Sequence, residues 1–267
     1  LWWQRGGVPF LGAYTDLLKN WESNETAAEF VRQKIRQIVQ DPVVAEALLP
    51  TYTIGCKRLA VDSGYYETYN RPNVTLVDIS ESPIEKFTPS GIRALGREYA
   101  LDSLIMATGF DAMTGTLLKI DIKGRRGISL RDKWADGPRS YLGLGIAEFP
   151  NLFTITGPGS PSVLTNMLQS IEQHVDWIVD CLNYLRDKEI SEIEATQSAE
   201  DAWVIHNDEV ADAHIRNSCS SWYVGANIKG KPRVFMPYVG GFPRYVETCN
   251  EIAADGYSGF TLGSTSP

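Results

Sequence analysis

Lys57 and Arg58 are adjacent cations in an acidic chain, and they are the residues whose types and spacing most suggest chemistry. The pair follows Cys56 and precedes a tyrosine-rich segment that ends at Asn70. A lysine ammonium acts as a point charge on a phosphate, whereas a guanidinium presents several fixed donors to an oxyanion. Two neighbouring cations are also a common solvated surface pair, and composition alone favours that interpretation.

Two glycine-containing segments are further candidates for a binding site. Residues 107–111 (ATGFD) end an apolar run, and a glycine there lets a ligand or another backbone approach because it has no Cβ. Residues 156–167 (TGPGSPSVLTNM) lead into a predicted helix, whose first N–H groups favour negative charge. The second segment matches neither the phosphate-binding loop nor G-x-S-x-G. A purely structural role stays open for both segments: residues 107–111 could form only a tight turn, and residues 156–167 could form only a helix cap that binds no ligand.

Histidines and cysteines form no metal or nucleophile pattern in the sequence. His174, His206 and His214 lack metal-ligand spacing, and the four cysteines contain no C-x-x-C pair. His206 shares a predicted helical stripe with Trp203 and Val210, which favours a packed or boundary histidine. We therefore predict no metal site and reduced thiols.

Charge and composition narrow the class of protein. The 267 residues carry a net charge of −8 and are 43% hydrophobic, which suits one or two globular domains. An acidic balance argues against a nucleic-acid or anionic-membrane surface, and no apolar run has the length of a membrane span. We expect a cytoplasmic protein. The opening LWWQRGGVPF has no initiator methionine and no signal peptide, so we expect the later part of a longer polypeptide.

The elements that must position these residues alternate in type along the chain. Apolar residues at spacings of three and four predict helices. They cover residues 24–40, 42–49, 164–185, 198–213 and 245–254. Residues 73–79 are β-rich, a hairpin turns at residues 89–91, and near-continuous apolar runs at 103–111 and 149–159 predict buried strands of a parallel sheet. Strand, glycine turn and helix in succession predict an α/β doubly wound fold.

Five segments together resemble the C-terminal half of type I Baeyer–Villiger monooxygenases, in the phenylacetone and cyclohexanone monooxygenase group. They are GCKRLAVDSGYYETYNRPNV, SLIMATGFDAMTG, GPRSYLGLGIAEFPNLFTITGPGSPSVLTNMLQSIEQHVDW, SSWYVGANIKGKPRVFMPYVGG and GYSGF. The family's two G-x-G-x-x-G fingerprints and its F-x-G-x-x-x-H-x-x-x-W-P signature are not in the sequence.

The resemblance implies a fold and a domain plan. It implies a flavoprotein with two dinucleotide-binding domains, Rossmann-like FAD and NADP domains, plus a helical insert, of which only the C-terminal portions are here. Residues 1–53 would be the insert of the NADP domain. Residues 54–107 would complete that domain, and residues 108–267 would be the C-terminal part of the FAD domain.

The resemblance also implies roles for individual residues. Arg58 matches the catalytic arginine over the flavin, and Lys57 matches the lysine that binds the 2′-phosphate of NADP. The remaining matched positions are Trp222 on NADP, Gly109, Asn166 and Met167 on FAD, and Ser162, Val163, Leu164 and Met167 around the substrate. The longer form of the 159–167 loop, as in phenylacetone monooxygenase, favours aryl or bulky ketones.

The implied activity is a Baeyer–Villiger oxygenation that depends on FAD and NADPH. One oxygen atom of O₂ enters next to a ketone carbonyl through a flavin C4a-peroxide stabilised by Arg58, which gives an ester or lactone. The implied partners are the ketone, O₂ and an N-terminal half with both G-x-G-x-x-G motifs, and we expect the complete protein to be monomeric. Two alternatives stay open: an N- or S-oxygenating flavin monooxygenase, and a non-catalytic nucleotide-binding half-module.

Overall fold

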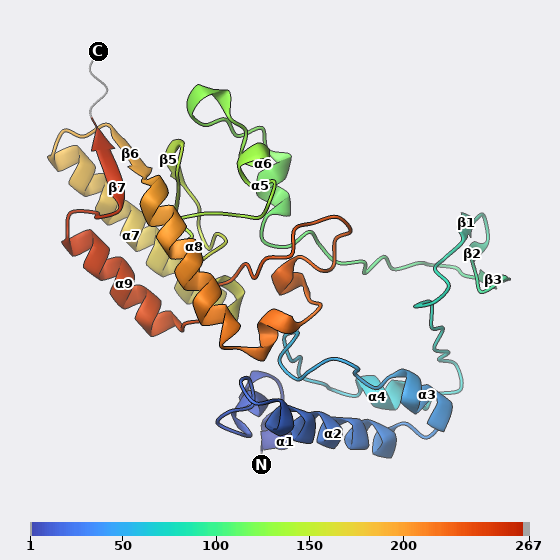
Figure 1. Cartoon of the computed structure of the whole chain (residues 1–267). Coiled ribbons are helices and arrows are strands. Elements are labelled where there is room, and N and C mark those ends of the chain that lie inside the picture. Colours follow the sequence, from blue (N-terminus) through green and yellow to red (C-terminus); the bar gives the residue numbers. More distant parts are fainter. Residues whose placement is uncertain (1, 264–267) are drawn as a thin grey trace. The chain divides into compact units, whose positions relative to one another are not determined.

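The structure, a computed structural model, describes residues 2–263 and divides into two compact units (Figure 1). Residues 1–110 form the first unit and residues 111–267 the second. The prediction that residue 107 ends one domain and residue 108 begins the next rests on the family resemblance and stays a prediction. Each unit is described by itself below.

The first unit begins with helices around an amphipathic α2. Its elements are α1 (Trp2–Arg5), the 3₁₀ helix η1 (Val8–Gly12), α2 (Trp21–Ile38), α3 (Pro42–Ala47) and α4 (Tyr65–Thr68). The predicted helices at 24–40 and 42–49 are therefore confirmed as α2 and α3. Helix α2 starts before its predicted first residue because the Asn20 side chain accepts hydrogen bonds from the backbone N–H groups of Glu22 and Ser23.

A small antiparallel sheet completes the first unit. It consists of β1 (Lys86–Thr88), β2 (Gly91–Ala94) and β3 (Arg97–Ala100), in that order. Thr88 pairs with Gly91, so the hairpin turns at Pro89 and Ser90 as predicted.

Two predicted strands of the first unit are wrong for this chain. Residues 73–79 and 103–111 belong to no strand, and the strands within residues 2–263 form only antiparallel pairs. Ile105 and Phe110 are each 88% exposed, so the second stretch is not buried. A central parallel strand needs hydrogen-bonded neighbours on both sides, and residues 2–263 supply none to these stretches.

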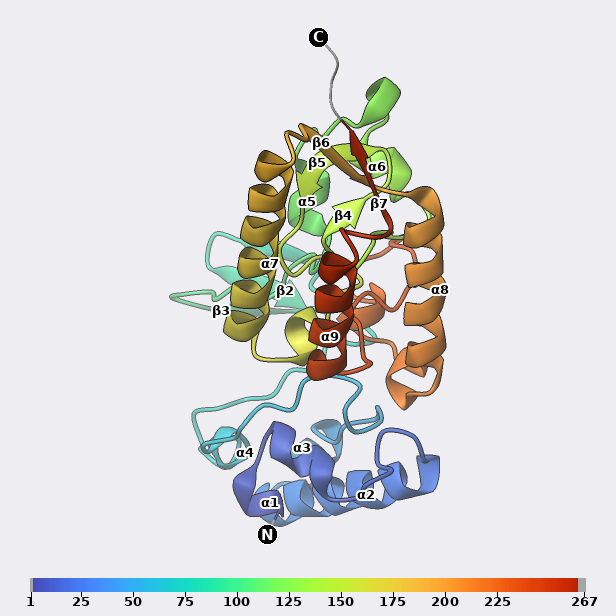
Figure 2. The same cartoon turned by 90° about the vertical axis from the view of Figure 1, so that its left-hand side faces the viewer.

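The second unit packs three long helices with short antiparallel strands. The three long helices are α7 (Met167–Asp187), α8 (Gln197–Asp212) and α9 (Phe242–Ala254), and two short helices, α5 (Gly115–Lys119) and α6 (Leu130–Lys133), precede them. The strands are β4 (Gly145–Ile146), β5 (Phe149–Phe153), β6 (Glu192–Ala195) and β7 (Phe260–Gly263), and the 3₁₀ helices are η2 (Arg125–Gly127), η3 (Ser162–Leu164), η4 (Ile215–Ser218) and η5 (Trp222–Val224). Helices α7 and α9 lie side by side (Figure 2). The predicted helices at 164–185, 198–213 and 245–254 are confirmed as α7, α8 and α9.

The predicted parallel strand at 149–159 is also wrong. Only its first part forms a strand, β5, and this strand pairs antiparallel with β4 through an irregular register. Strand β6 pairs antiparallel with β7. The chain returns from β4 to β5 within a few residues, and so short a connection can join only antiparallel strands.

Helix α7 buries a different face from the one predicted. Its buried residues are Ser170, His174, Trp177, Cys181 and Leu185. The sequence pattern predicts an apolar stripe of Ile171, Val175, Ile178, Leu182 and Leu185, but only Leu185 of these is buried, and Val175 and Leu182 are exposed. The buried face combines aromatic with polar side chains, because His174 and Trp177 find hydrogen-bond partners inside the core.

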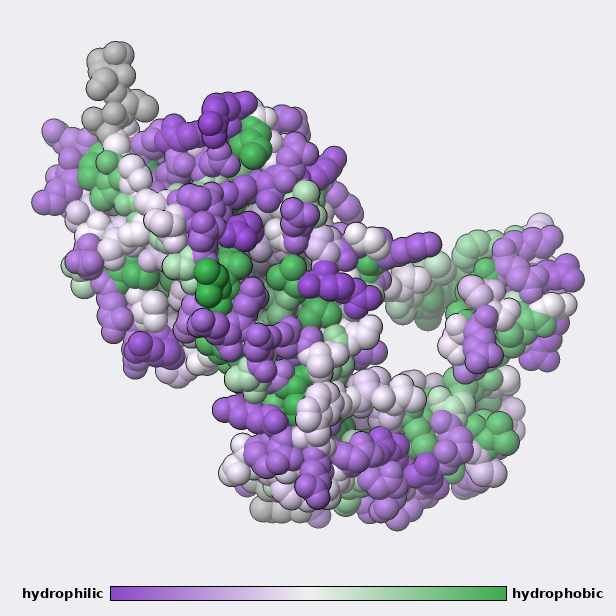
Figure 3. Space-filling view, in the orientation of Figure 1, coloured by the Kyte–Doolittle hydropathy of each residue, from purple (hydrophilic) through white to green (hydrophobic). Residues whose placement is uncertain are grey.

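The surface of the molecule mixes polar and apolar residues. On the face drawn in Figure 3, hydrophobic residues form small patches among hydrophilic ones. None of the helices in the described part of the chain is long and apolar enough to cross a membrane.

Candidate functional site

Lys57 and Arg58 follow a tight turn, residues 53–56, which we call the Lys-Arg turn. The Cys56 N–H donates to the Thr53 carbonyl at 3.1 Å, and Gly55 has a φ of 85°, a conformation that favours glycine. Cys56 is buried, whereas the two cations are exposed. The backbone of the turn is therefore buried, and we call it the base of the two exposed cations that follow it.

Asn24 of α2 fixes this base. Its Nδ2 donates to the carbonyls of Leu17 and Ile54, both at 2.9 Å, and its Oδ1 accepts from the Ile54 N–H at 3.0 Å. Asn24 is only 1% exposed, so these bonds replace those that water would make. We did not predict Asn24 from the sequence, although it shares a helical face with Ala28 and Ile35 and is the one polar residue there.

Replacing Asn24 by leucine is expected to lower the free energy of unfolding by about 3 kcal/mol. The substitution leaves the Ile54 N–H and two carbonyls buried without partners, and each such group costs about 1–3 kcal/mol. Urea unfolding measures the change. Gln33→Leu, on the exposed side of the same helix, is the control and should stay close to wild type. Equal stability of the two variants would contradict the role of Asn24.

Lys57 lies over an aromatic ring. Its Nζ is 4.4 Å from the ring centroid of Tyr52, within the range of a cation–π interaction. Tyr52 precedes the turn and Lys57 follows it, so the turn brings the two side chains together.

The glycine turn of the second unit, residues 156–161, is held by hydrogen bonds from three directions. Ser140 Oγ donates to the Pro158 carbonyl at 2.5 Å, and Trp203 Nε1 donates to the Gly159 carbonyl at 2.9 Å. The Gly159 N–H donates to the Met236 carbonyl at 2.7 Å. The Pro158 and Gly159 carbonyls and the Gly159 N–H therefore already have hydrogen-bond partners within the protein.

The glycines of the two candidate segments differ in what surrounds them. A Cβ added at Gly157 would lie 2.5 Å from Thr154 Oγ1 and 2.7 Å from the Gly143 carbonyl oxygen. Gly157 therefore allows a close approach of the chain to itself, which settles that position as structural. A Cβ at Gly109 would meet nothing within 4 Å, and its φ of 84° is what favours glycine there. The backbone at Gly109 is open to another group.

The loop after the glycine turn brings several predicted residues together. Val163 and Leu164 of η3 pack with Trp222 of η5 against a buried cluster that includes Tyr223 and Phe235. Ser162 is buried, and its Oγ lies 3.8 Å from Met113 Sδ.

The same loop ends at α7. Asn166 caps this helix by accepting from the Leu168 N–H at 3.1 Å, and Met167 is its first residue. Six predicted positions thus lie in two neighbouring stretches of the second unit, namely Ser162, Val163, Leu164, Asn166, Met167 and Trp222. Lys57, Arg58 and Gly109 belong to the first unit.

Lys231 links two of the quoted motifs within the second unit. Its Nζ donates to Asp111 Oδ1 at 2.5 Å and to the Ala112 carbonyl at 2.9 Å. This ties the end of the ATGFD segment to the loop that follows Trp222. No local sequence pattern predicts this contact, because 120 positions separate Lys231 from Asp111.

His174 and Tyr245 form a buried relay beneath the glycine turn. His174 Nδ1 accepts from the Thr156 N–H at 3.0 Å, so its proton lies on Nε2, which donates to Tyr245 Oη at 2.8 Å. Tyr245 Oη in turn donates to the Leu142 carbonyl at 2.6 Å. Burial lowers the pKa of His174 to about 4 and raises the pKa of Tyr245 well above its usual value. Both side chains are neutral, and the relay fixes the glycine turn.

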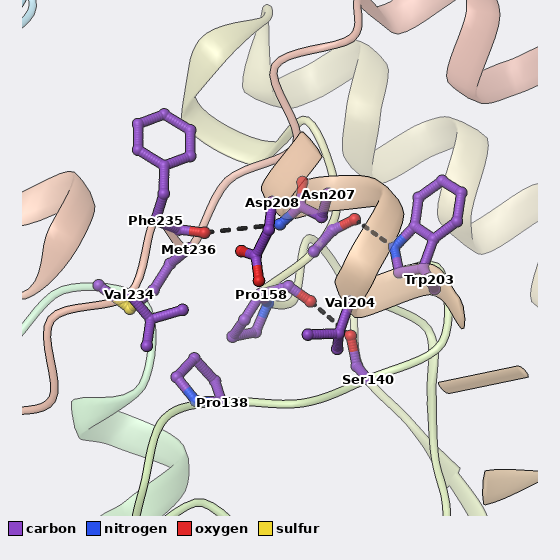
Figure 4. A pocket seen from close by; sticks show the side chains of 11 residues that line it. Pro138, Ser140, Pro158, Trp203, Val204, Asn207, Asp208, Val234, Phe235 and Met236 are labelled. Atoms are coloured by element: carbon purple, nitrogen blue, oxygen red, sulfur yellow. Dashed lines mark hydrogen bonds between the residues drawn. The ribbon is translucent and has the colours of Figure 1, made fainter. Parts of the chain in front are cut away.

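A small cavity beside the glycine turn is lined by Ser140, Pro158, Trp203 and Asn207 among others (Figure 4). Its volume of about 20 Å³ holds about one water molecule, so neither a flavin nor a nucleotide fits. Asn207 Oδ1 is buried without a hydrogen-bond partner, as expected where a water completes the bonding. Within residues 2–263, no group of three or more His, Cys, Asp or Glu side chains could hold a metal ion.

The chain resembles known proteins over nearly its whole length. A Baeyer–Villiger monooxygenase of Pseudooceanicola batsensis is 42% identical over 96% of this chain, which covers 47% of that protein. A structure of an oxidized steroid monooxygenase bound to NADP is 50% identical, with a TM-score of 0.89, over 97% of this chain and 49% of the other. A structure titled OTEMO complex with FAD and NADP is 41% identical, with a TM-score of 0.88, over 94% and 46%. No family model matches.

The likeness confirms the predicted fold class, the C-terminal portions of a flavoprotein with FAD and NADP domains. Within residues 2–263, the stretches predicted to form parallel strands have no parallel neighbours. The chain spans about half the length of the curated relatives it matches. At 41–50% identity over more than nine-tenths of its residues, the chain is similar to one half of Baeyer–Villiger and related flavin monooxygenases.

Proposed function

We propose that this chain is the C-terminal half of a monooxygenase that uses FAD and NADPH to convert a ketone and O₂ into an ester or lactone. The observation that carries the proposal is the exposed Lys57–Arg58 pair, which follows a buried turn that Asn24 holds by hydrogen bonds. The chain that carries this pair is 50% identical to a steroid monooxygenase whose structure has NADP bound. Two cations that were merely solvated would need no such base, because water alone would hydrate them.

The residues present suit the two cofactors. Lys57 would hold the 2′-phosphate of NADPH, and Trp222 would contact the same cofactor. Gly109 is open to a neighbouring group, and Asn166 with Met167 begins the long helix α7, so these positions would border FAD. When bound, NADPH supplies a hydride and FAD supplies the activation of O₂. Residues 1–53, 54–107 and 108–267 would then be the insert, the end of the NADP domain and the end of the FAD domain.

Arg58 would stabilise the negative charge that develops on oxygen during the reaction. Its guanidinium is always protonated and offers fixed donors, so it needs no reorganisation when the charge appears. Lysine is less suited to that task and better suited to a phosphate, which agrees with the order of the pair.

The ketone would lie against the loop of residues 162–167. Ser162, Val163, Leu164 and Met167 would shape its pocket, and the length of the loop favours aryl or bulky ketones. The remaining half of the complete protein would supply the strands that residues 73–79 and 103–110 lack.

The test is NADPH consumption by the complete protein with a panel of ketones, with products identified by mass. Ester or lactone formation supports the proposal. Amine or sulfide oxygenation without ester would favour an N- or S-oxygenating monooxygenase. Absence of NADPH consumption with every substrate would favour a nucleotide-binding half-module.

Lys57→Ala in the complete protein is expected to raise the KM for NADPH about 10- to 100-fold and to leave the KM for NADH nearly unchanged. The variant loses a charge-assisted contact to the 2′-phosphate, which only NADPH carries. Steady-state kinetics with both cofactors measures the difference. Equal effects on the two cofactors would remove the assignment of Lys57.

A further inference from the structure

Tyr52 and Lys57 face each other across the Lys-Arg turn. The Lys57 ammonium is 4.4 Å from the Tyr52 ring centroid, and Ile54, between them, is pinned at both its N–H and its carbonyl by Asn24. The backbone between the two side chains is therefore fixed at Ile54, which is buried.

Tyr52 is 43% exposed, so more than half of its surface is covered by the protein. Burial raises the pKa of its phenol, which therefore stays neutral and adds no charge beside Lys57. The ring under Lys57 is thus partly covered and uncharged.

An aromatic ring in this position can orient an ammonium without using up its N–H donors. The attraction is to the face of the ring, so the N–H groups that point away from the ring stay available to a phosphate. A carboxylate partner would instead compete with the phosphate for the same donors. A lysine held in advance also loses less rotamer freedom when it binds, which increases affinity.

We propose that Tyr52 is a positioning residue that holds Lys57 ready for the 2′-phosphate and so contributes to the preference for NADPH over NADH. This inference rests on the proposed function, because Lys57 must be the residue that contacts the 2′-phosphate. The oxygen chemistry assigned to Arg58 is not involved.

The test measures binding of 2′,5′-ADP and 5′-AMP to the complete protein by calorimetry, together with kcat/KM for NADPH and NADH. Tyr52→Leu should weaken 2′,5′-ADP binding about two- to fivefold and leave 5′-AMP binding unchanged. The kcat/KM for NADPH should fall by the same factor, with that for NADH unaffected. Tyr52→Phe and Tyr52→Trp keep an aromatic face and should retain wild-type selectivity.

Matched variants separate the possible failures. Tyr14→Leu removes a tyrosine of the first unit that is also 43% exposed, and it should change neither nucleotide's binding. If Lys57→Met leaves 2′,5′-ADP binding intact, the assignment of Lys57 itself fails. If Lys57→Met weakens it but Tyr52→Leu does not, only the positioning role is overturned. Equal weakening of both nucleotides by Tyr52→Leu would also overturn it, because it would indicate a general structural effect.

Discussion

Arg58→Ala in the complete protein is expected to leave reduction of the flavin by NADPH nearly intact and to slow ester formation about 10²- to 10³-fold. Loss of one preorganised donor to a developing oxyanion typically has this effect on kcat. Flavin reduction moves a hydride and places no new charge on a substrate oxygen, so it does not depend on the same donor. Anaerobic stopped-flow absorbance measures reduction, and product mass measures ester formation.

Two variants make the Arg58 result specific. Arg58→Lys keeps the charge but loses the planar fork of donors, and it should stay at least about tenfold below wild type in ester formation. Arg71→Ala removes another exposed arginine of the first unit and should leave both steps unchanged. Undiminished ester formation in Arg58→Ala would refute the role that we give to this residue.

The helices could be predicted from the sequence because their signals are local. Helices α2, α7, α8 and α9 each carry apolar residues at helical spacing, and their caps lie within a few residues. The buried face of α7 could not be predicted in the same way. His174 belongs to that face only because Thr156 and Tyr245, which are distant in the sequence, satisfy its two nitrogens.

The parallel strands were predicted wrongly for a different physical reason. Residues 103–110 have the apolar composition of a central parallel strand, but such a strand exists only when its neighbours are present. The hairpin of β1 and β2 forms because both partners and the turn at Pro89 lie within a few residues of each other. The composition of a segment therefore indicates whether it can form a strand. Whether the strand forms depends on partner residues elsewhere in the sequence.

The site was predicted unevenly for the same reason. Lys57, Arg58 and the loop of residues 162–167 could be assigned because they lie in contiguous motifs that resemble a family. Asn24 and Tyr52 act on the Lys-Arg turn through contacts that no contiguous motif records. The roles of Lys57 and Arg58 stay predictions that the variants above test.

The relay of His174 and Tyr245 is expected to make the protein less stable as the pH falls from about 6.5 to about 4. Burial holds the pKa of His174 at about 4 in the folded state, whereas its ordinary value is 6.5. Between these values the unfolded chain binds a proton that the folded chain does not, so protonation favours unfolding. A difference of this size corresponds to about 3 kcal/mol of free energy of unfolding. Well above pH 6.5 the imidazole is neutral in both the folded and the unfolded chain, so this histidine no longer contributes a pH dependence there.

His174→Gln isolates this contribution, because glutamine keeps one acceptor and one donor but does not titrate in this range. The variant should be less stable near neutral pH, since its amide cannot reproduce both bonds of the imidazole. Its free energy of unfolding in urea should fall less steeply than that of wild type between pH 6.5 and 4. His206→Gln, on the exposed side of α8, is the matched control and should keep the wild-type slope. An unchanged slope in His174→Gln would mean that the buried imidazole does not govern acid stability, whatever its role in fixing the glycine turn.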